Sequence, residues 1–188
     1  MPKTRCAWVT NDPLYQQYHD EEWGRPVYSG RQLFEFLVLE GQQAGLSWIT
    51  ILKKREHYRR VFCQFDPEVI VAFTQLDFDR LMQDAGIVRN RRKIASVIQN
   101  AKAYLRLADQ GVDFSEWIWQ FVGGEPQRHC WQSASEVPVL SAESKRMSTE
   151  LKKAGFSFVG PTICYAFMQA VGMVWDHTAD CFLSDAPV

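Results

Sequence analysis

The stretch LMQDAGIVRNRRKI, residues 81–94, decides which kind of fold the chain can adopt. A short helical segment, FDRLMQDA, ends at Gly86, a natural left-handed helix stop, and a longer segment with a basic beginning follows. This order is typical of a helix–hairpin–helix, which we expect over about residues 78–108. In that motif the glycine lets the backbone approach a phosphate, which the beginning of the second helix also faces. An ordinary helical hairpin with a solvated, charged edge is the more frequent source of such a pattern.

Helical patterns also dominate the rest of the chain. After the hairpin, apolar residues recur at intervals of three and four, as on one face of a long helix that Gly111 closes. Asp66-Pro67 places a capping acid before a proline at the first helical position. Further helices are expected over 31–44, 48–62, 114–122, 141–155 and 161–172. Alternating strand patterns are confined to very short runs, so the sequence predicts an all-α fold.

The totals narrow the class of protein. A chain of 188 residues suits one domain, expected over residues 1–188, and 46% hydrophobic with 23% charged residues is ordinary for a soluble globular protein. No apolar run approaches the ~20 residues of a membrane helix, and no signal peptide is evident, so we expect a cytoplasmic protein. A net charge of −1 argues against a strongly basic nucleic-acid coat protein. Local basic clusters remain at 53–60 and 89–93.

Cysteine and histidine residues near both ends form a candidate metal site. Cys6 and His19 lie near the beginning with twelve residues between them, and His177 and Cys181 lie near the end with three between them. Two cysteines and two histidines are the composition of a closed, structural zinc site. Two unrelated surface pairs would explain the residues equally well, because this order is not that of a standard zinc finger. The other cysteines (Cys63, Cys130 and Cys164) have apolar or aromatic neighbours and are expected in the core.

An acid interrupts the apolar stripe of the helix expected over 31–44. Glu40 lies one helical turn after Phe36, where the pattern calls for an apolar residue. Aromatic residues are frequent in the same first fifty residues: Trp8, Tyr15, Tyr18, Trp23 and Trp48. Rings that stack, together with a carboxylate that accepts N–H hydrogen bonds, would suit a flat, partly cationic heterocycle. Alternatively, the rings belong to the core and Glu40 caps a backbone group or pairs with an arginine.

Five segments together resemble the DNA-3-methyladenine glycosylase I (Tag) family. They are CAWVTNDPLYQQYHDEEWG (6–24), LFEFLVLEGQQAGLSWITILKKRE (33–56), QDAGIVRNRRKI (83–94), GFSFVGPTICYAFMQA (155–170) and DHTADC (176–181). The resemblance covers essentially the whole chain, although 123–146 fits loosely and the final FLSDAPV carries no motif. It implies an α-helical fold of the helix–hairpin–helix glycosylase superfamily, and removal of 3-methyladenine from alkylated double-stranded DNA.

Matched residue by residue, the resemblance also implies roles. The base-binding glutamate falls on Glu40, and the aromatic residues of the base pocket fall on Tyr18 and Trp48, with Trp8, Tyr15 and Trp23 nearby. A small tip that enters the DNA falls on Gly45 and Leu46, and the hairpin falls on Gly86 and its flanks. The local positive charge of the basic run that follows, independently of the resemblance, suggests Arg89 and Lys93 as DNA contacts. The ligands of one structural zinc fall on Cys6, His19, His177 and Cys181.

The chemistry of the substrate decides what such a site needs. Methylation at N3 gives the adenine a positive charge, so it can leave as a neutral molecule without strong acid catalysis. The nucleotide must first be flipped out of the duplex, which costs a few kcal/mol. We therefore expect Glu40 to be the main functional carboxylate, in a monomer that leaves an abasic site. Asp113 and Glu116 could support a sugar cation by spacing alone, but helix capping explains them better.

Two other classes of protein remain possible from the sequence. A zinc-stabilised helical module could bind duplex DNA without any catalysis. A hydrolytic metalloenzyme would need an open coordination position on its zinc, which a set of four protein ligands does not offer.

Overall fold

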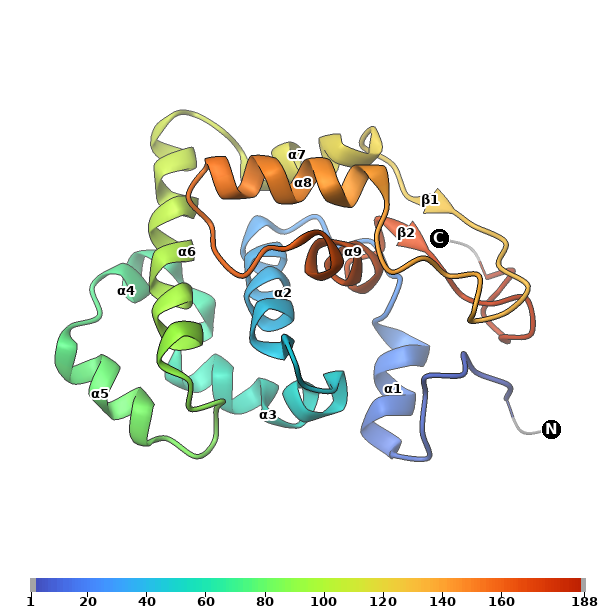
Figure 1. Ribbon diagram of the computed structural model, residues 1–188, viewed down its shortest axis with the longest axis horizontal. Helices are drawn as coiled ribbons and strands as arrows, with labels where there is room; N and C mark the ends of the chain where they lie inside the picture. The colour runs from blue at the N-terminus through green and yellow to red at the C-terminus, as the bar shows by residue number, and fades with distance from the viewer. Residues whose placement is uncertain (1–2, 187–188) are drawn as a thin grey trace.

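Helices account for most of the computed structural model, which describes residues 3–186 (Figure 1). In chain order they are α1 (Pro13–Glu21), α2 (Gly30–Gln43), α3 (Trp48–Val61), α4 (Pro67–Val71), α5 (Gln75–Gln83), α6 (Arg91–Asp109), α7 (Phe114–Trp119), α8 (Ala142–Lys153) and α9 (Pro161–Ala170). Single turns of 3-10 helix cover Cys63–Phe65 and Gln120–Val122, and the strands are β1 (Gln127–Arg128) and β2 (Val174–Trp175). The predicted all-α fold is confirmed.

Side-chain caps explain why several helices begin where they do. Asp66 accepts a hydrogen bond from the amide of Glu68, with Pro67 at the first helical position of α4. Ser141 and Ser144 exchange hydrogen bonds at the beginning of α8. Asp113 accepts from the amide of Glu116 at the beginning of α7, which confirms that it is a helix cap.

Helix α2 forms the centre of the core. It packs against α3, α6, α7 and α9, and in Figure 1 it passes between α6 on one side and α1 with β2 on the other. Its residues Leu33, Phe34, Leu37 and Leu39 are completely buried. Each such side chain contributes about 1.5–3 kcal/mol through burial. Because the core is built around α2, the end of this helix has a fixed position relative to the rest of the protein.

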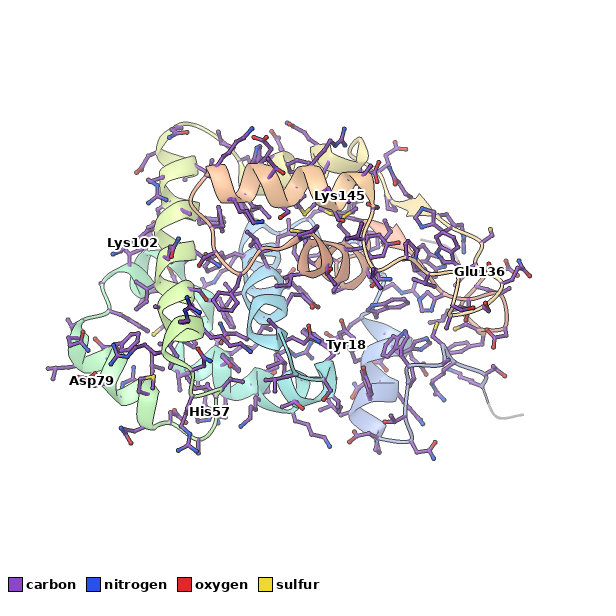
Figure 2. The ribbon with its side chains drawn as sticks, in the orientation of Figure 1. Tyr18, His57, Asp79, Lys102, Glu136 and Lys145 are labelled. Carbon is purple, nitrogen blue, oxygen red and sulfur yellow. The ribbon has the colours of Figure 1, made fainter. Side chains whose placement is uncertain are left out.

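The predicted helix–hairpin–helix is present, with a different role for its glycine. Helix α5 ends at Gln83 and α6 begins after Asn90, whose side chain accepts hydrogen bonds from two amides of the first turn. Gly86 does not have a positive φ, so it is not the left-handed stop that was expected. A Cβ at this position would lie 2.2 Å from Cδ2 of His57, which Figure 2 labels at the edge where α3 meets the hairpin. Glycine is required here because the His57 ring occupies the space.

Several features differ from the sequence expectations. Cys63 and Cys130 are exposed rather than part of the core, whereas Cys164 is buried as expected. Residues Cys63–Phe65 all have positive φ values, a left-handed turn that nothing in the local sequence announces. Helix α1 and the parallel pairing of β1 with β2 were also not predicted. The pairing joins segments 47 residues apart, as Gln127 opposite Val174 shows, and such distant partners leave no local pattern.

Among the described residues, no helix combines the length and the apolar character that crossing a lipid bilayer requires. The single-domain organisation stays a prediction. What the structure describes is one cluster of buried apolar residues that draws on helices from both ends of the chain.

Candidate functional site

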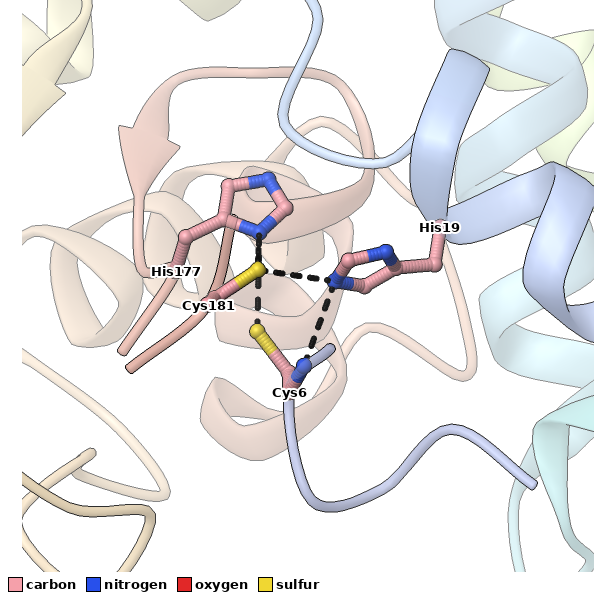
Figure 3. Close-up of side chains that lie close together, drawn as sticks. All are labelled: Cys6, His19, His177 and Cys181. Carbon is pink, nitrogen blue, oxygen red and sulfur yellow. Dashed lines mark hydrogen bonds between the residues drawn. The ribbon is translucent and has the colours of Figure 1, made fainter. Parts of the chain in front are cut away.

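Four buried side chains from the two ends of the chain meet in one cluster (Figure 3). Sγ of Cys181 lies 3.5 Å from Nε2 of His19 and 3.5 Å from Nδ1 of His177. Sγ of Cys6 lies 3.5 Å from the same Nδ1. All four potential ligand atoms lie within 4.8 Å of one another. The structure therefore brings together the four residues that the sequence suggested, and two unrelated surface pairs are excluded.

The geometry of this cluster fits a tetrahedral metal ion. Zinc binds sulfur at about 2.3 Å and nitrogen at about 2.0–2.1 Å, which separates tetrahedral ligand atoms by about 3.5 Å. Hydrogen bonds from Cys6 and from both imidazoles lower the pKa of the Cys181 thiol, so a thiolate ligand is available. Four protein ligands leave no open position for water, which suits a structural ion rather than a catalytic one.

A second layer of contacts orients His19. Its Nδ1 lies 2.9 Å from Oδ1 of Asp20, which leaves Nε2 facing the cluster. Burial would raise the pKa of Asp20, but hydrogen bonds from Arg5 and His19 lower it to about 2. Asp20 therefore stays ionised and holds the imidazole in one orientation, as outer carboxylates do at metal sites.

A cavity of about 410 Å³ lies next to the cluster, and Cys6 contributes to its wall. All the aromatic residues predicted for the pocket line it, together with Glu40: Trp8, Tyr15, Tyr18, Trp23 and Trp48. The rings contact one another, and the centroids of Tyr18 and Trp48 are 5.6 Å apart. Tyr18, labelled in Figure 2, is a buried residue of α1. The cavity has the size and the aromatic walls that a purine requires.

Glu40 is buried without a partner. Its side chain is 4% exposed, and among residues 3–186 no hydrogen bond or ion pair reaches its carboxyl group. Burial raises its pKa to about 8. A carboxyl with this pKa is mainly protonated at pH 7. The indole N–H of Trp48 is likewise buried without an acceptor. Glu40 and Trp48 both line the cavity, so their polar groups are available to a ligand bound there.

The far wall of the cavity was not predicted from the sequence. It comes from the loop before α8 and from α9 and its continuation: Ala134, Val137, Pro138, Val139, Thr162, Tyr165, Ala166, Gln169, Asp176 and Thr178. Part of the segment 123–146, which fits the family only loosely, therefore lines the pocket. The sequence feature that could have indicated this wall is Pro138, which stands between two valines in an otherwise polar region.

The carboxyl group of Asp176 joins the segments of this wall by hydrogen bonds. Its Oδ2 accepts hydrogen bonds from the Tyr165 hydroxyl at 2.7 Å and from Nε2 of Gln169 at 2.8 Å. Its Oδ1 lies 2.6 Å from Nδ1 of His129 and 2.8 Å from the indole nitrogen of Trp131. One buried carboxyl thus joins α9 to the loop that closes the cavity.

The turn after α2 presents an apolar tip to solvent. Gly45 has a φ of +76°, and a Cβ placed there would meet no atom within 4 Å, so only its backbone conformation calls for glycine. Leu46, beside it, is 38% exposed. Gln43 braces the turn, because its Nε2 donates to the Leu46 carbonyl at 2.7 Å. Ser47 stands at the N-cap of α3, but its hydroxyl bonds Thr50 instead of a backbone amide.

Several side chains of the local basic clusters have partners within the protein. In the 53–60 cluster, Lys53 pairs with Asp12 and Arg55 with Glu22, and the ammonium of Lys54 donates to a hairpin carbonyl. Arg89 is exposed and, within the described part of the chain, forms no ion pair, so it is free to contact a phosphate.

Lys93 and the hairpin amides differ from the expectation. Lys93 is 6% exposed and its ammonium donates to two backbone carbonyls, so it does not face a phosphate in this structure. The amide of Gly86 donates to the Asp84 carboxylate at 2.8 Å, and the amide of Val88 donates to the Tyr58 hydroxyl at 3.0 Å. The hairpin therefore offers DNA fewer free amides than its sequence suggested.

A helical fold with a helix–hairpin–helix, and a purine-sized aromatic pocket with a buried carboxyl, define the class of helical DNA glycosylases. The sequence profile of the methyladenine glycosylase family matches residues 8–184. The chain belongs to this family.

Relatives of known name agree over nearly the full length. The chain is 53% identical to DNA-3-methyladenine glycosylase 1 of Escherichia coli strain K12 over 177 residues, which cover 94% of this chain and 95% of the relative. It is 51% identical to DNA-3-methyladenine glycosylase of Haemophilus influenzae, over 95% of this chain and 96% of the relative. A crystal structure of 3-methyladenine DNA glycosylase I superposes with a TM-score of 0.94 at 52% identity, over 95% of this chain and 98% of that one.

A second structural match bears on recognition. The structure described as the basis of 3-methyladenine recognition by the Staphylococcus aureus 3-methyladenine DNA glycosylase I superposes with a TM-score of 0.93 at 38% identity. The superposition covers 98% of each chain. The fold that surrounds the cavity is therefore shared with a protein whose known ligand is the methylated base.

Proposed function

We propose that this protein hydrolyses the N-glycosidic bond of 3-methyladenine in alkylated double-stranded DNA and leaves an abasic site. One observation carries the proposal: Glu40 is a buried carboxyl without a partner in a cavity walled by aromatic rings. A flat base with a positive charge and an amino edge supplies what this cavity lacks. Ring stacking, cation–π attraction and N–H donors to Glu40 would all be satisfied together.

Recognition follows from the charge of the damaged base. A cation beside Glu40 stabilises the ionised carboxylate and offsets the burial that raises the pKa of this group. Neutral adenine offers no such compensation, and it is also better paired and stacked in the duplex. Both effects favour the flipped, methylated nucleotide over the normal one.

The bond-breaking step needs little from the protein. As the bond between the sugar C1′ and the base nitrogen breaks, its electron pair passes to the cationic ring, and the base leaves as a neutral molecule. Water adds to C1′ and releases its proton to solvent, so an abasic site remains. Among residues 3–186 no lysine lines the cavity, which supports simple hydrolysis without strand cleavage. The protein contributes by holding the base in the flipped position.

The residues outside the cavity have supporting roles in this proposal. Leu46 fills the space that the flipped nucleotide leaves, and Arg89 contacts phosphate. Cys6, His19, His177 and Cys181 hold one structural zinc, which fastens the N-terminal aromatic wall to the C-terminal segment. The chain acts as a monomer in the cytoplasm, where free thiols are maintained.

Excision by variants of Glu40 tests the proposal. DNA treated with a methylating agent is incubated with Glu40→Gln, Glu40→Ala and wild-type protein, and the released bases are separated by chromatography. Hydrogen bonds to a charged group are worth about 1.5–3 kcal/mol, so both variants should lose about 10- to 150-fold in 3-methyladenine release. Glu35→Gln is the matched control, because Glu35 lies on the same helix, pairs with Arg59 and does not line the cavity.

Each alternative outcome points to a different class of protein. Full activity of both Glu40 variants, with folding intact, would remove Glu40 from the mechanism. Binding of duplex DNA without any released base would indicate a binding module. Loss of turnover with a chelator, while the protein stays folded, would indicate a catalytic metal.

A further inference from the structure

Lys93 is a buried cation whose side chain reaches from α6 to the end of α2. Its Nζ donates to the carbonyls of Gln42 and Ala44, each at 2.7 Å. Among the described residues it has no carboxylate partner, and burial lowers its pKa. The last carbonyls of a helix lack partners within the helix and carry partial negative charge. Lys93 therefore caps α2 from a different element.

The contact is reciprocal and extends to the hairpin. Nε2 of Gln42 donates to the backbone carbonyl of Lys93 at 2.9 Å. The hydroxyl of Tyr58 donates to Oε1 of Gln42 at 3.3 Å, and the amide of Val88 in the hairpin donates to the same hydroxyl at 3.0 Å. These bonds connect α2, α3, the hairpin and α6 into one buried network.

The turn that carries the apolar tip begins directly after Ala44, the last residue to which this network is bonded. Ala44, which accepts from Lys93, is followed directly by Gly45 and Leu46. Gly45 and Leu46 are exposed. Backbone bonds from Ala44 and Leu46 and the side chain of Gln43 close the turn onto the end of α2, and Lys93 joins it to α6.

We infer that Lys93 is a positioning residue, which fixes the Gly45–Leu46 tip relative to the hairpin so that seating the hairpin on the DNA backbone also inserts Leu46. This inference rests on the proposed function, because it assigns Leu46 to the duplex. Lys93 does not touch the base or the phosphate. It acts through the carbonyls at the end of α2, one residue before the tip.

Lys93→Met tests the inference, since it keeps the aliphatic stem and removes the donors. Lys102→Met is the matched control, because Lys102 lies on the same helix, is exposed, and points away from the core in Figure 2.

Three properties are measured: base release from methylated duplex, fluorescence of 2-aminopurine flipped from a duplex, and binding of free 3-methyladenine followed by tryptophan fluorescence. We expect Lys93→Met to lose at least tenfold in release and in flipping, and to bind the free base within about twofold of wild type. Lys102→Met should match wild type throughout.

A double variant separates positioning from a general loss of structure. If Lys93 acts through Leu46, Lys93→Met should reduce flipping by less than about twofold when Leu46 is already alanine. Wild-type flipping by a folded Lys93→Met protein would overturn the inference. So would weakened binding of the free base in parallel with flipping, since this indicates a merely structural role. Failure of the proposed function is seen separately, as wild-type protein that flips 2-aminopurine but releases no 3-methyladenine.

Discussion

Replacing Glu40 with glutamine should stabilise the folded protein, and increasingly so as the pH rises. Glu40 has no partner, and burial raises its pKa from the ordinary value of 4.5 to about 8. A carboxyl whose pKa is higher in the folded state contributes its stability below the pKa of the unfolded chain. That contribution is lost as the pH rises through the folded value. The ionisation of Glu40 therefore makes the wild-type protein less stable as the pH rises from about 4.5 to about 8.

The size of the effect follows from the two pKa values. Each tenfold change in a protonation equilibrium is worth about 1.4 kcal/mol, so a rise of about 3.5 in pKa corresponds to about 5 kcal/mol in full. Between pH 6 and pH 9, about 3 kcal/mol of this should be expressed. Glutamine has nearly the same shape and does not titrate, so it lacks this pH-dependent cost.

Urea unfolding at pH 6 and pH 9 measures the difference directly. The free energy of unfolding of Glu40→Gln, relative to wild type, should increase by about 3 kcal/mol between the two pH values. Comparing the two proteins at each pH cancels the titration of the metal ligands, which both contain. Parallel pH profiles of the two proteins would refute the reasoning, because they would mean that Glu40 ionises in the folded state as readily as in the unfolded chain.

Two further predictions concern the hairpin and the metal. Gly86→Ala should lower the free energy of unfolding by about 1–3 kcal/mol, because its Cβ would overlap the His57 ring, and His57→Ala should restore most of this loss. An unchanged unfolding midpoint in urea for Gly86→Ala would contradict the packing argument. Metal analysis of the purified protein should give about one zinc per chain, and Cys181→Ser should lower the thermal midpoint more than it lowers turnover by the folded fraction. A stable native protein without metal would refute this ligand set.

Local rules accounted for most helix boundaries. Asp66 and Ser141 mark helix beginnings through hydrogen bonds to residues only a few positions away, so the sequence contains the relevant information. Pro161 marks the beginning of α9 through its own fixed φ. The expected helices over 31–44 and 48–62 agree with α2 and α3 to within one residue at each end. The left-handed turn at Cys63–Phe65 escaped prediction because Arg31, distant in the sequence, donates to its carbonyls.

The candidate site likewise contains residues that the sequence predicted and residues that only distant contacts bring into place. Glu40 was noticeable because it interrupts an apolar stripe. The cysteines and histidines near both ends already suggested four metal ligands, and the resemblance favoured that interpretation over two unrelated pairs. The wall around Asp176 depends on partners 45 and 47 residues away, which periodicity does not register. Lys93 shows the limit most clearly, since its place in a basic run predicted a surface contact. Only the tertiary structure brings the end of α2 close enough to bury its ammonium.

The cluster that joins the two ends of the chain also sets an order of events during synthesis. Cys181 leaves the ribosome 162 residues after His19, so the cluster is unable to form until those residues have been made. Glu40 and the apolar tip of the turn after α2 are made early, but the cavity has no far wall until α9 and the residues beyond it have emerged. A nascent chain that lacks α9 and the residues beyond it therefore has an incomplete cavity and is unable to hold a flipped base.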